Sequence, residues 1–365
     1  MSHEQTRRDF LKAGSAVVAG ATWCGSRATS DASQTAASRP ADADRPVDPA
    51  TILNYNSKMG YRRLGKTGLM ISEISLGGHP GPGGDSEAVR RAVLERAIAL
   101  GMNYVDNNIV EECALYGRAM GKDLRKHFYI GFASWPEKLT SEYEDQITVP
   151  GLLAEIDARL KAYNTDMLDL WRPVGATWGE GQTKQDTMWE VNEKTLDKVV
   201  EAFDRAHRQG KVRFLGISAH KPSVFKRVLN QYPQFSVILF PYMFLTKSFG
   251  GDSLLALAAE KNVGVIGIKP FAAGATFVGG TPIKFEGNVD PRATSLLKAM
   301  LAEKRVSAII PGVAVPEQLD ANVRASYERD QPLTEKDKQA LLECTENFHA
   351  HLPAHYQWLH RWKMV

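Results

Sequence analysis

From residue 74 to residue 324 the chain alternates short apolar runs with segments of helical periodicity, and this alternation constrains the fold more than any other feature. The apolar runs predict eight strands, at residues 74–76, 103–106, 128–133, 167–171, 214–218, 237–240, 263–268 and 308–310. The periodic segments predict eight helices, at residues 86–100, 115–124, 149–163, 196–208, 222–229, 254–261, 293–301 and 317–324. Strands that alternate with helices form a parallel sheet, and eight such units predict an α/β fold, a closed (β/α)8 TIM barrel.

Two further segments flank these units. Short alternating runs at residues 59–63 and 69–71 enclose the turn Leu64-Gly-Lys-Thr-Gly68 and predict an N-terminal β-hairpin. Beyond residue 330 we expect a helix and then a tail that is rich in aromatic residues and histidines. The barrel is therefore predicted to span residues 58–330, and the C-terminal helix and tail to span residues 331–365.

The N-terminus is predicted to carry a targeting signal. Thr6-Arg-Arg-Asp-Phe-Leu-Lys12 resembles the twin-arginine (Tat) export motif, and a mildly apolar stretch follows it at residues 13–23. A charged region followed by a short apolar region is typical of a secretory leader. Residues 1–30 are predicted to be a Tat signal peptide and residues 31–57 a disordered linker. The protein is therefore expected to be exported to the periplasm, with the Tat translocon as its partner during export.

Composition argues against several classes of function. The net charge of +3 comes without a basic stripe interleaved with aromatic residues, so no nucleic-acid partner is expected. No apolar run reaches the roughly 20 residues that span a bilayer, so an integral membrane protein is not expected. The three cysteines, Cys24, Cys113 and Cys344, are too widely spaced for a disulfide framework or a zinc site. A small-molecule substrate remains the expected partner.

In barrels of this kind the active site lies at the carboxyl ends of the strands. The residues at or just after the predicted strand ends are His79, Asp106, Ala133, Arg172, Ser218, Phe240 and Lys269. They are the first candidates for a functional site.

Five segments, taken in order, resemble the aldo-keto reductase superfamily. They are Tyr61-Arg-Arg-Leu-Gly-Lys-Thr-Gly-Leu69, Gly101-Met-Asn-Tyr-Val-Asp106, Gly210-Lys-Val-Arg-Phe-Leu-Gly-Ile-Ser218, Ile268-Lys-Pro270 and Ile310-Pro-Gly-Val-Ala-Val-Pro-Glu-Gln-Leu319 with Asn322. The resemblance implies a (β/α)8 barrel that transfers a hydride from NADPH to a carbonyl, with a tyrosine as proton donor. It also implies a C-terminal tail over or beside the barrel mouth.

The same resemblance assigns the catalytic positions, and most of them carry other residues here. The family's aspartate is Asp106, but the tyrosine five residues later is Glu111. The lysine position is Ala133, or Ser134 if the alignment is one residue off, and the histidine position is Val174.

The cofactor positions are kept little better than the catalytic ones. Ser218, Lys269 and Asn322 match cofactor-binding positions, whereas Ala219 and Leu239 replace an asparagine and a glutamine. The implied cofactor is NADP or NAD, and a protein without cofactor is the alternative.

Glu111 offers a different chemistry. It would lie close to Asp106 and next to Glu112, and like charges at that distance favour protonation of one carboxyl. Such a pair is suited to general acid/base work on a polyol or sugar, so Asp106 and Glu111 are the predicted catalytic residues. Alternatively, Glu111 caps the following helix or pairs with a surface arginine.

Four residues are predicted to bind substrate. Only one of Trp171 and Arg172 can point into the barrel, and an inward Arg172 would bind a carboxylate or pair with Glu111, whereas an outward one would be salt-bridged in the helix layer. His79 and His220 would reach the mouth from strands one and five. Trp358 in the tail would either stack on a sugar ring or pack against the barrel wall. No ligand spacing supports a metal site, so none is predicted.

Three functions remain open. The favoured one is an exported NAD(P)-linked oxidoreductase acting on a sugar-like or small carbonyl substrate. The second is a cofactor-independent barrel enzyme, a carbohydrate lyase, epimerase or hydrolase that uses Asp106 and Glu111. The third is a non-catalytic barrel that binds a ligand.

Overall fold

The computed structural model describes residues 47–79, 86–134, 147–174, 193–219, 222–246, 252–277, 289–353 and 359. The predicted signal peptide and two of the predicted substrate residues, His220 and Trp358, lie outside these ranges.

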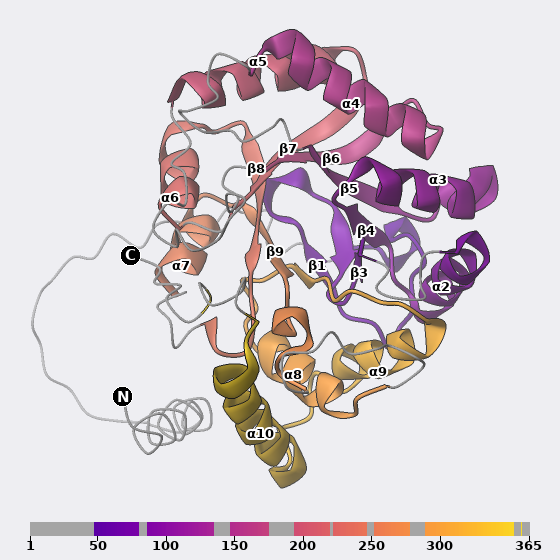
Figure 1. Cartoon of the computed structure of the whole chain (residues 1–365), viewed down its shortest axis with the longest axis vertical. Coiled ribbons are helices and arrows are strands. Elements are labelled where there is room, and N and C mark those ends of the chain that lie inside the picture. The colour runs from indigo at the N-terminus through magenta and orange to yellow at the C-terminus, as the bar shows by residue number, and fades with distance from the viewer. Residues whose placement is uncertain are drawn as a thin grey trace, which may run out of the picture. The chain divides into compact units, whose positions relative to one another are not determined.

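The centre of the structure is a closed parallel barrel (Figure 1). Its strands are β3 (Leu76–Gly77), β4 (Tyr104–Asn107), β5 (Tyr129–Ser134), β6 (Leu168–Pro173), β7 (Val212–Ser218), β8 (Phe235–Pro241), β9 (Gly264–Ile268) and β10 (Ala308–Ile309). Each strand pairs in parallel with its neighbours in sequence order. Parallel bridges between Ile74 and Ile309 and between Gly77 and Gly312 join the first strand to the last. The predicted (β/α)8 barrel is confirmed.

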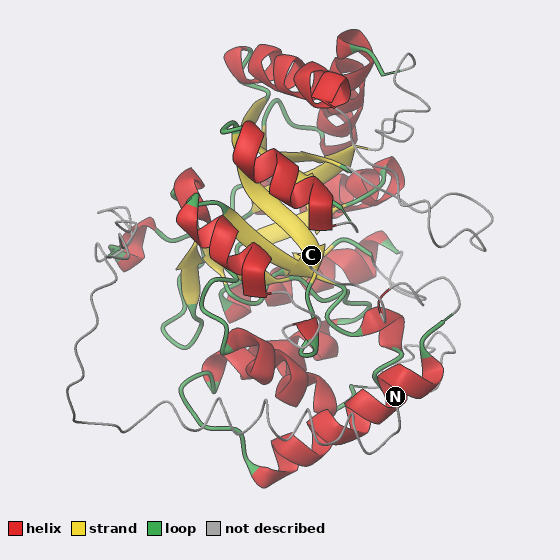
Figure 2. Ribbon diagram, turned by 90° about the vertical axis from the view of Figure 1, so that its left-hand side faces the viewer, coloured by secondary structure: helices red, strands yellow, loops and turns green. Residues whose placement is uncertain are grey.

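Helices surround the strands, as Figure 2 shows in red around yellow. They are α2 (Glu87–Leu100), α3 (Val110–Arg125), α4 (Val149–Tyr163), α5 (Glu193–Arg208), α6 (Pro222–Gln231), α7 (Asp252–Glu260), α8 (Arg292–Leu301), α9 (Pro316–Tyr327) and α10 (Glu335–His351). Their ends follow local rules: the Ser86 side chain accepts a hydrogen bond from the Val89 amide, and Gly101 ends α2 in the left-handed region, at φ 92°. None of the helices in the described ranges is long and apolar enough to cross a membrane.

Strand alternation divides the core into two layers. Inside the barrel, strand residues such as Tyr104, Leu170 and Leu239 pack together with Leu64 and Ile71 of the N-terminal hairpin. Residues of opposite parity face outward and pack against the helices, in a larger cluster that includes Phe132, Trp171, Ile217 and Phe240. Each strand is therefore apolar on both faces, as expected when helices cover the outside of a barrel and side chains fill it.

The predicted hairpin closes the amino end of the barrel. Strand β1 (Tyr61–Arg63) pairs antiparallel with β2 (Met70–Ser72), and the 3-10 turn η2 (Gly65–Thr67) joins them. The Lys66 amide donates to the Asn262 carbonyl just before β9. Gly65 lies so close to Gly264 that a Cβ atom at Gly65 would meet the Gly264 nitrogen at 2.2 Å.

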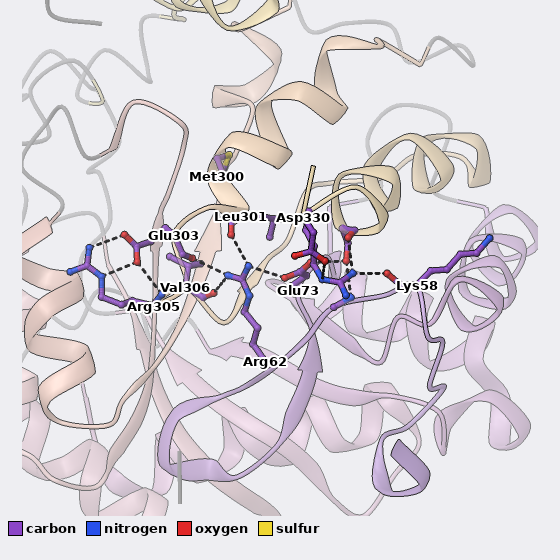
Figure 3. A network of polar contacts seen from close by, with 12 residues as sticks. Lys58, Arg62, Glu73, Met300, Leu301, Glu303, Arg305, Val306 and Asp330 are labelled. Carbon is purple, nitrogen blue, oxygen red and sulfur yellow. Dashed lines mark hydrogen bonds and ion pairs between the residues drawn. The ribbon is translucent and has the colours of Figure 1, made fainter. Parts of the chain in front are cut away.

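Arg62 fastens this hairpin to the last βα units (Figure 3). Its guanidinium donates to the carbonyls of Leu301, Glu303 and Val306 at 2.7–2.9 Å and pairs with Glu73 at 2.8 Å. The other oxygen of Glu73 accepts a hydrogen bond from Ser326. The network joins β1 to the segments around α8 and α9.

Helix α10 packs at the opposite end of the strands. Phe348 is buried with Met243 and Leu245, which follow β8, and with Ala272 and Ala275, which follow β9. The Asn347 amide donates to the carbonyls of residues 276 and 277. The C-terminal helix therefore holds the loop that follows β9.

The described part of the predicted linker, residues 47–57, contacts the barrel. The short 3-10 turn η1 (Pro49–Thr51) is followed by Ile52, which is buried. The Asn54 side chain donates hydrogen bonds to the carbonyls of Met102 and His127.

Candidate active site

Asp106 lies at the carboxyl end of β4 and points into the barrel, where 2% of it is exposed. One carboxylate oxygen, Oδ1, accepts hydrogen bonds from Nε of Arg172 at 2.8 Å and from its Nη2. The other, Oδ2, accepts from the Tyr104 hydroxyl at 2.7 Å. Both oxygens of this carboxylate are therefore held from within the barrel.

Arg172 reaches Asp106 from β6. It also donates from Nη1 to the Ser218 hydroxyl at 3.0 Å and from Nη2 to the Asn107 carbonyl at 3.4 Å. Burial works to lower the pKa of Arg172, but the charge of Asp106 and the hydrogen bonds to it outweigh burial, and the pKa is raised. The structure thus brings together Asp106, Arg172 and Ser218 as a charged, buried network.

The orientation of Arg172 shows which of Trp171 and Arg172 faces the barrel interior. Trp171 points outward into the helix layer, where its Nε1 donates to Ser134 at 2.6 Å. Ala133 is the register partner of Arg172 on β5, and it is the residue that shares the inward parity of Gly131. The strand that would carry the family's lysine therefore presents a methyl group to the interior.

Gly131 makes room for the phenol below Asp106. A Cβ atom there would meet the Tyr104 hydroxyl at 2.0 Å and Oδ2 of Asp106 at 2.5 Å. Burial, together with the negative charge of Asp106, raises the pKa of Tyr104 well above its ordinary value. Tyr104 is therefore a poor proton donor to a substrate, and its hydroxyl serves to hold Asp106.

The two glutamates after Asp106 lie in different places. Helix α3 begins at Val110, five residues before the predicted start at Leu115, so both glutamates lie in its first turn. Glu111 is exposed. Glu112 is buried: its Oε2 accepts from the amides of Asn108 and Ile109, and its other oxygen pairs with Nδ1 of His79.

From the sequence we did not predict that Glu112 caps helix α3, although a glutamate at the third position of a helix commonly accepts a hydrogen bond from a free amide at the helix N-terminus. Burial works to raise the pKa of Glu112, but the hydrogen bonds from His79 and the two backbone amides lower it. The helix-capping role that we considered for Glu111 is thus filled by its neighbour.

The predicted cofactor residues lie on three different segments. Ser218 ends β7, Lys269 follows β9, and Asn322 lies in α9. Lys269 has φ 56°, and Ala272 and Ala273 soon after it also have positive φ. Strained backbone of this kind tends to occur where a loop is shaped for function.

The described residues fit a polar ligand at this end. Asn322 is 3% exposed, and among the described residues its side-chain amide has no hydrogen-bond partner. The Ser218 hydroxyl accepts from Arg172 and keeps its own hydrogen for a ligand. Helix α9 begins directly after the loop 310–315, where Gln318 accepts a hydrogen bond from the Ala314 amide. Within the described ranges, no three His, Cys, Asp or Glu side chains form a metal-binding group.

Comparisons with known proteins agree with this architecture. The model of the Aldo/keto reductase family matches residues 73–292. An uncharacterized oxidoreductase, YqkF, from Bacillus subtilis is 24% identical over 79% of this chain and 97% of its own length. L-galactose dehydrogenase from Arabidopsis thaliana is 24% identical over 80% and 97%. The holo form of aldo-keto reductase AKR11C1 from Bacillus halodurans superposes with a TM-score of 0.57, at 22% identity over 78% and 96%, which supports the fold.

Proposed function

The chain belongs to the aldo/keto reductase family, and from this premise we propose that it is an exported oxidoreductase that uses NADP or NAD on a sugar-like or small carbonyl substrate. The relative named for L-galactose supports the choice of substrate class. The barrel supports it too, because its polar side chains meet at the carboxyl ends of the strands, where such barrels carry out their chemistry.

One observation carries the proposal: the network of Asp106, Arg172 and Ser218. Through Arg172, the network links Asp106, the catalytic residue that the resemblance implies, to Ser218, which the resemblance assigns to cofactor binding. Arg172 supplies, from β6, a cation beside Asp106 that Ala133 on β5 does not offer. The buried carboxylate therefore keeps a charged partner although the usual lysine position has none.

Ser218, Lys269 and Asn322 would hold the dinucleotide at this end of the barrel. When bound, a reduced nicotinamide supplies a hydride to the carbonyl carbon. Ser218 and Asn322 offer the buried polar groups described above. Asp106 and Arg172 keep the floor of the site polar and fixed, which favours one substrate orientation.

Export through the Tat route is part of the proposal. It rests on Arg7 and Arg8 and the apolar stretch after them, which lie outside the described residues. The Tat route carries folded proteins, so the cofactor would travel inside the barrel and be recycled in place. The periplasm is therefore the proposed location.

A binding measurement tests the proposal. Protein purified from its native export route should contain a nicotinamide nucleotide by absorbance and mass spectrometry, and stripped protein should quench or shift NADPH fluorescence. Asn322→Ala should weaken NADPH binding about tenfold, the loss of roughly one good hydrogen bond. The control is Asn230→Ala, an exposed asparagine in α6. No bound nucleotide together with no NADPH response would overturn the proposal.

The geometry argues against the cofactor-independent alternative. In a cofactor-independent enzyme Asp106 and Glu111 would act as a pair, but both oxygens of Asp106 are held by Arg172 and Tyr104, and Glu111 is exposed. That alternative requires turnover without nucleotide and its loss in Glu111→Gln. A non-catalytic barrel requires ligand binding without turnover of any carbonyl.

A further inference from the structure

A histidine and a glutamate form a pair at the barrel mouth that the family assignment does not explain. His79 follows β3, and 68% of its side chain is exposed, whereas the Glu112 side chain is 6% exposed. Nδ1 of His79 faces the Glu112 carboxylate. The other ring nitrogen, Nε2, is thus left on the exposed side of the ring.

Glu112 is fixed from two sides. Its Oε2 accepts from the Asn108 amide at 2.8 Å and from the Ile109 amide at 3.4 Å, at the first turn of α3. A carboxylate held by a helix N-terminus keeps its charge and its orientation. Glu112 can therefore fix the ring of His79, in the way that a buried carboxylate orients a catalytic imidazole.

The main chain that leads to His79 runs between the end of β4, which carries Asp106, and the loop that leads to α9. Gly77 is the register partner of Asp106, and a Cβ atom at Gly78 would meet the Asp106 carbonyl at 2.5 Å. On the other side, the His79 carbonyl would lie 3.3 Å from a Cβ atom at Gly312, in the loop that leads to α9. The two residues before His79 therefore lie beside the Asp106 backbone, and the His79 carbonyl lies beside the loop that leads to the helix carrying Asn322.

We propose that His79 is the group that exchanges a proton with the substrate oxygen, and that Glu112 is the positioning residue that orients it. The inference rests on the proposed function, since it supplies the proton donor that this function needs. The resemblance places the donor at Glu111, but no side-chain contact within the described residues fixes that exposed group, and Tyr104 is buried beneath Asp106. His79 combines exposure with a fixed ring.

The proton balance of the step is simple. In reduction, the carbonyl carbon receives a hydride from the reduced nicotinamide, and the carbonyl oxygen receives a proton from Nε2 of the protonated imidazole. The C=O double bond becomes an alcohol, the nicotinamide is oxidised by two electrons, and His79 regains its proton from water. In oxidation, the neutral ring carries its proton on Nδ1, toward Glu112, and Nε2 accepts the alcohol proton.

Imidazole nitrogen NMR of the full-length protein tests the geometry without any substrate. Neutral His79, identified by the signal missing from His79→Gln, should carry its proton on Nδ1. In Glu112→Gln the amides of Asn108 and Ile109 still need an acceptor, so the new side chain must turn its oxygen toward them and its NH2 toward His79. That reverses the hydrogen bond, and the neutral ring should then carry its proton on Nε2.

Kinetics with NADPH test the chemistry, with 4-nitrobenzaldehyde and DL-glyceraldehyde as probes. His79→Gln should lower kcat by about 10²–10⁴-fold while the Kd for NADPH stays within about twofold. Glu112→Gln should lower kcat by about tenfold or more, because the ring takes the wrong tautomer. The matched control is Glu87→Gln, an exposed first-turn glutamate of α2 that pairs with Arg118. It should change neither the tautomer nor kcat.

Each outcome decides one claim. A wild-type rate in His79→Gln, or an unchanged tautomer in Glu112→Gln, overturns the inference about the pair. Wild-type protein that binds NADPH but reduces neither aldehyde also counts against His79 as a proton donor and favours the non-catalytic barrel. Wild-type protein that does not bind NADPH overturns the proposed function instead, and the tautomer measurement still decides whether Glu112 orients His79.

Discussion

At the scale of single residues, the buried pair of Arg172 and Asp106 should matter most for stability. Arg172→Met leaves the Asp106 carboxylate inside the barrel without its cation, and an uncompensated buried charge costs about 3–5 kcal/mol. The free energy of unfolding in urea measures this loss. Adding Asp106→Asn removes the orphaned charge, so the double variant should recover much of the stability. A double variant less stable than Arg172→Met would contradict this account.

A second residue-scale prediction concerns pH and Glu112. Its pKa is lowered in the folded protein, so its stabilising effect is full above the ordinary value of 4.5 and is lost as pH falls through the lower folded value. The difference in unfolding free energy between wild type and Glu112→Gln should therefore shrink as pH falls from 4.5 toward 3. Glu87→Gln supplies the baseline for general acid unfolding. A difference that stays constant or grows below pH 4.5 would refute this sign.

The sequence predicts Asp106, Arg172 and Ser218 as site residues but not the contacts among them, for a geometric reason. Alternation along β6 allowed either Trp171 or Arg172 to face inward, and the interior contacts with β4 and β7 were needed to choose. The position five residues after Asp106 is Glu111, but whether Glu111 or Glu112 is buried depends on the residue at which α3 begins. His79 was predicted at the mouth, whereas its partner Glu112 was not.

At the scale of elements, the predicted segments were accurate wherever a local signal marks the end. Helix α4 has its predicted bounds, and both of its ends carry a local signal: Thr148 caps its start, and Asn164, in the left-handed conformation, ends it. Helix α3 was predicted to start too late. Its first turn lacks an apolar stripe and is capped by Glu112 rather than by the side chain of the residue before it, Ile109.

The hairpin gives an element-scale prediction. Arg62→Ala should lower the free energy of unfolding by about 3 kcal/mol or more, because Glu73, which is 1% exposed, loses its cation and three carbonyls lose their donor (Figure 3). The neighbouring Arg63→Ala is the control, since within the described residues that side chain donates a single long hydrogen bond, to the Gly68 carbonyl at 3.4 Å. Equal losses in the two variants would show that the network does not hold the hairpin.

At the scale of the whole molecule, the closed barrel could be predicted from the sequence because each strand and helix of the barrel has a local pattern, an apolar run or a helical periodicity. The closure itself needs only that the last strand meet the first, as the bridge of Ile74 to Ile309 shows. What local patterns could not give are the contacts between distant segments. The packing of Phe348 against the loops after β8 and β9 joins residues about a hundred positions apart.

The proposed export makes a prediction about the complete chain. Arg7→Lys combined with Arg8→Lys should retain the protein in the cytoplasm, because the proposed signal depends on the arginine pair. If the barrel folds and binds its nucleotide before export, the retained variant and exported wild type should contain the same nicotinamide nucleotide in the same proportion. Fractionation followed by mass spectrometry of the purified proteins measures both. Export of the double-lysine variant at the wild-type level would contradict the Tat route, whereas nucleotide in the retained protein alone would contradict export in the loaded form.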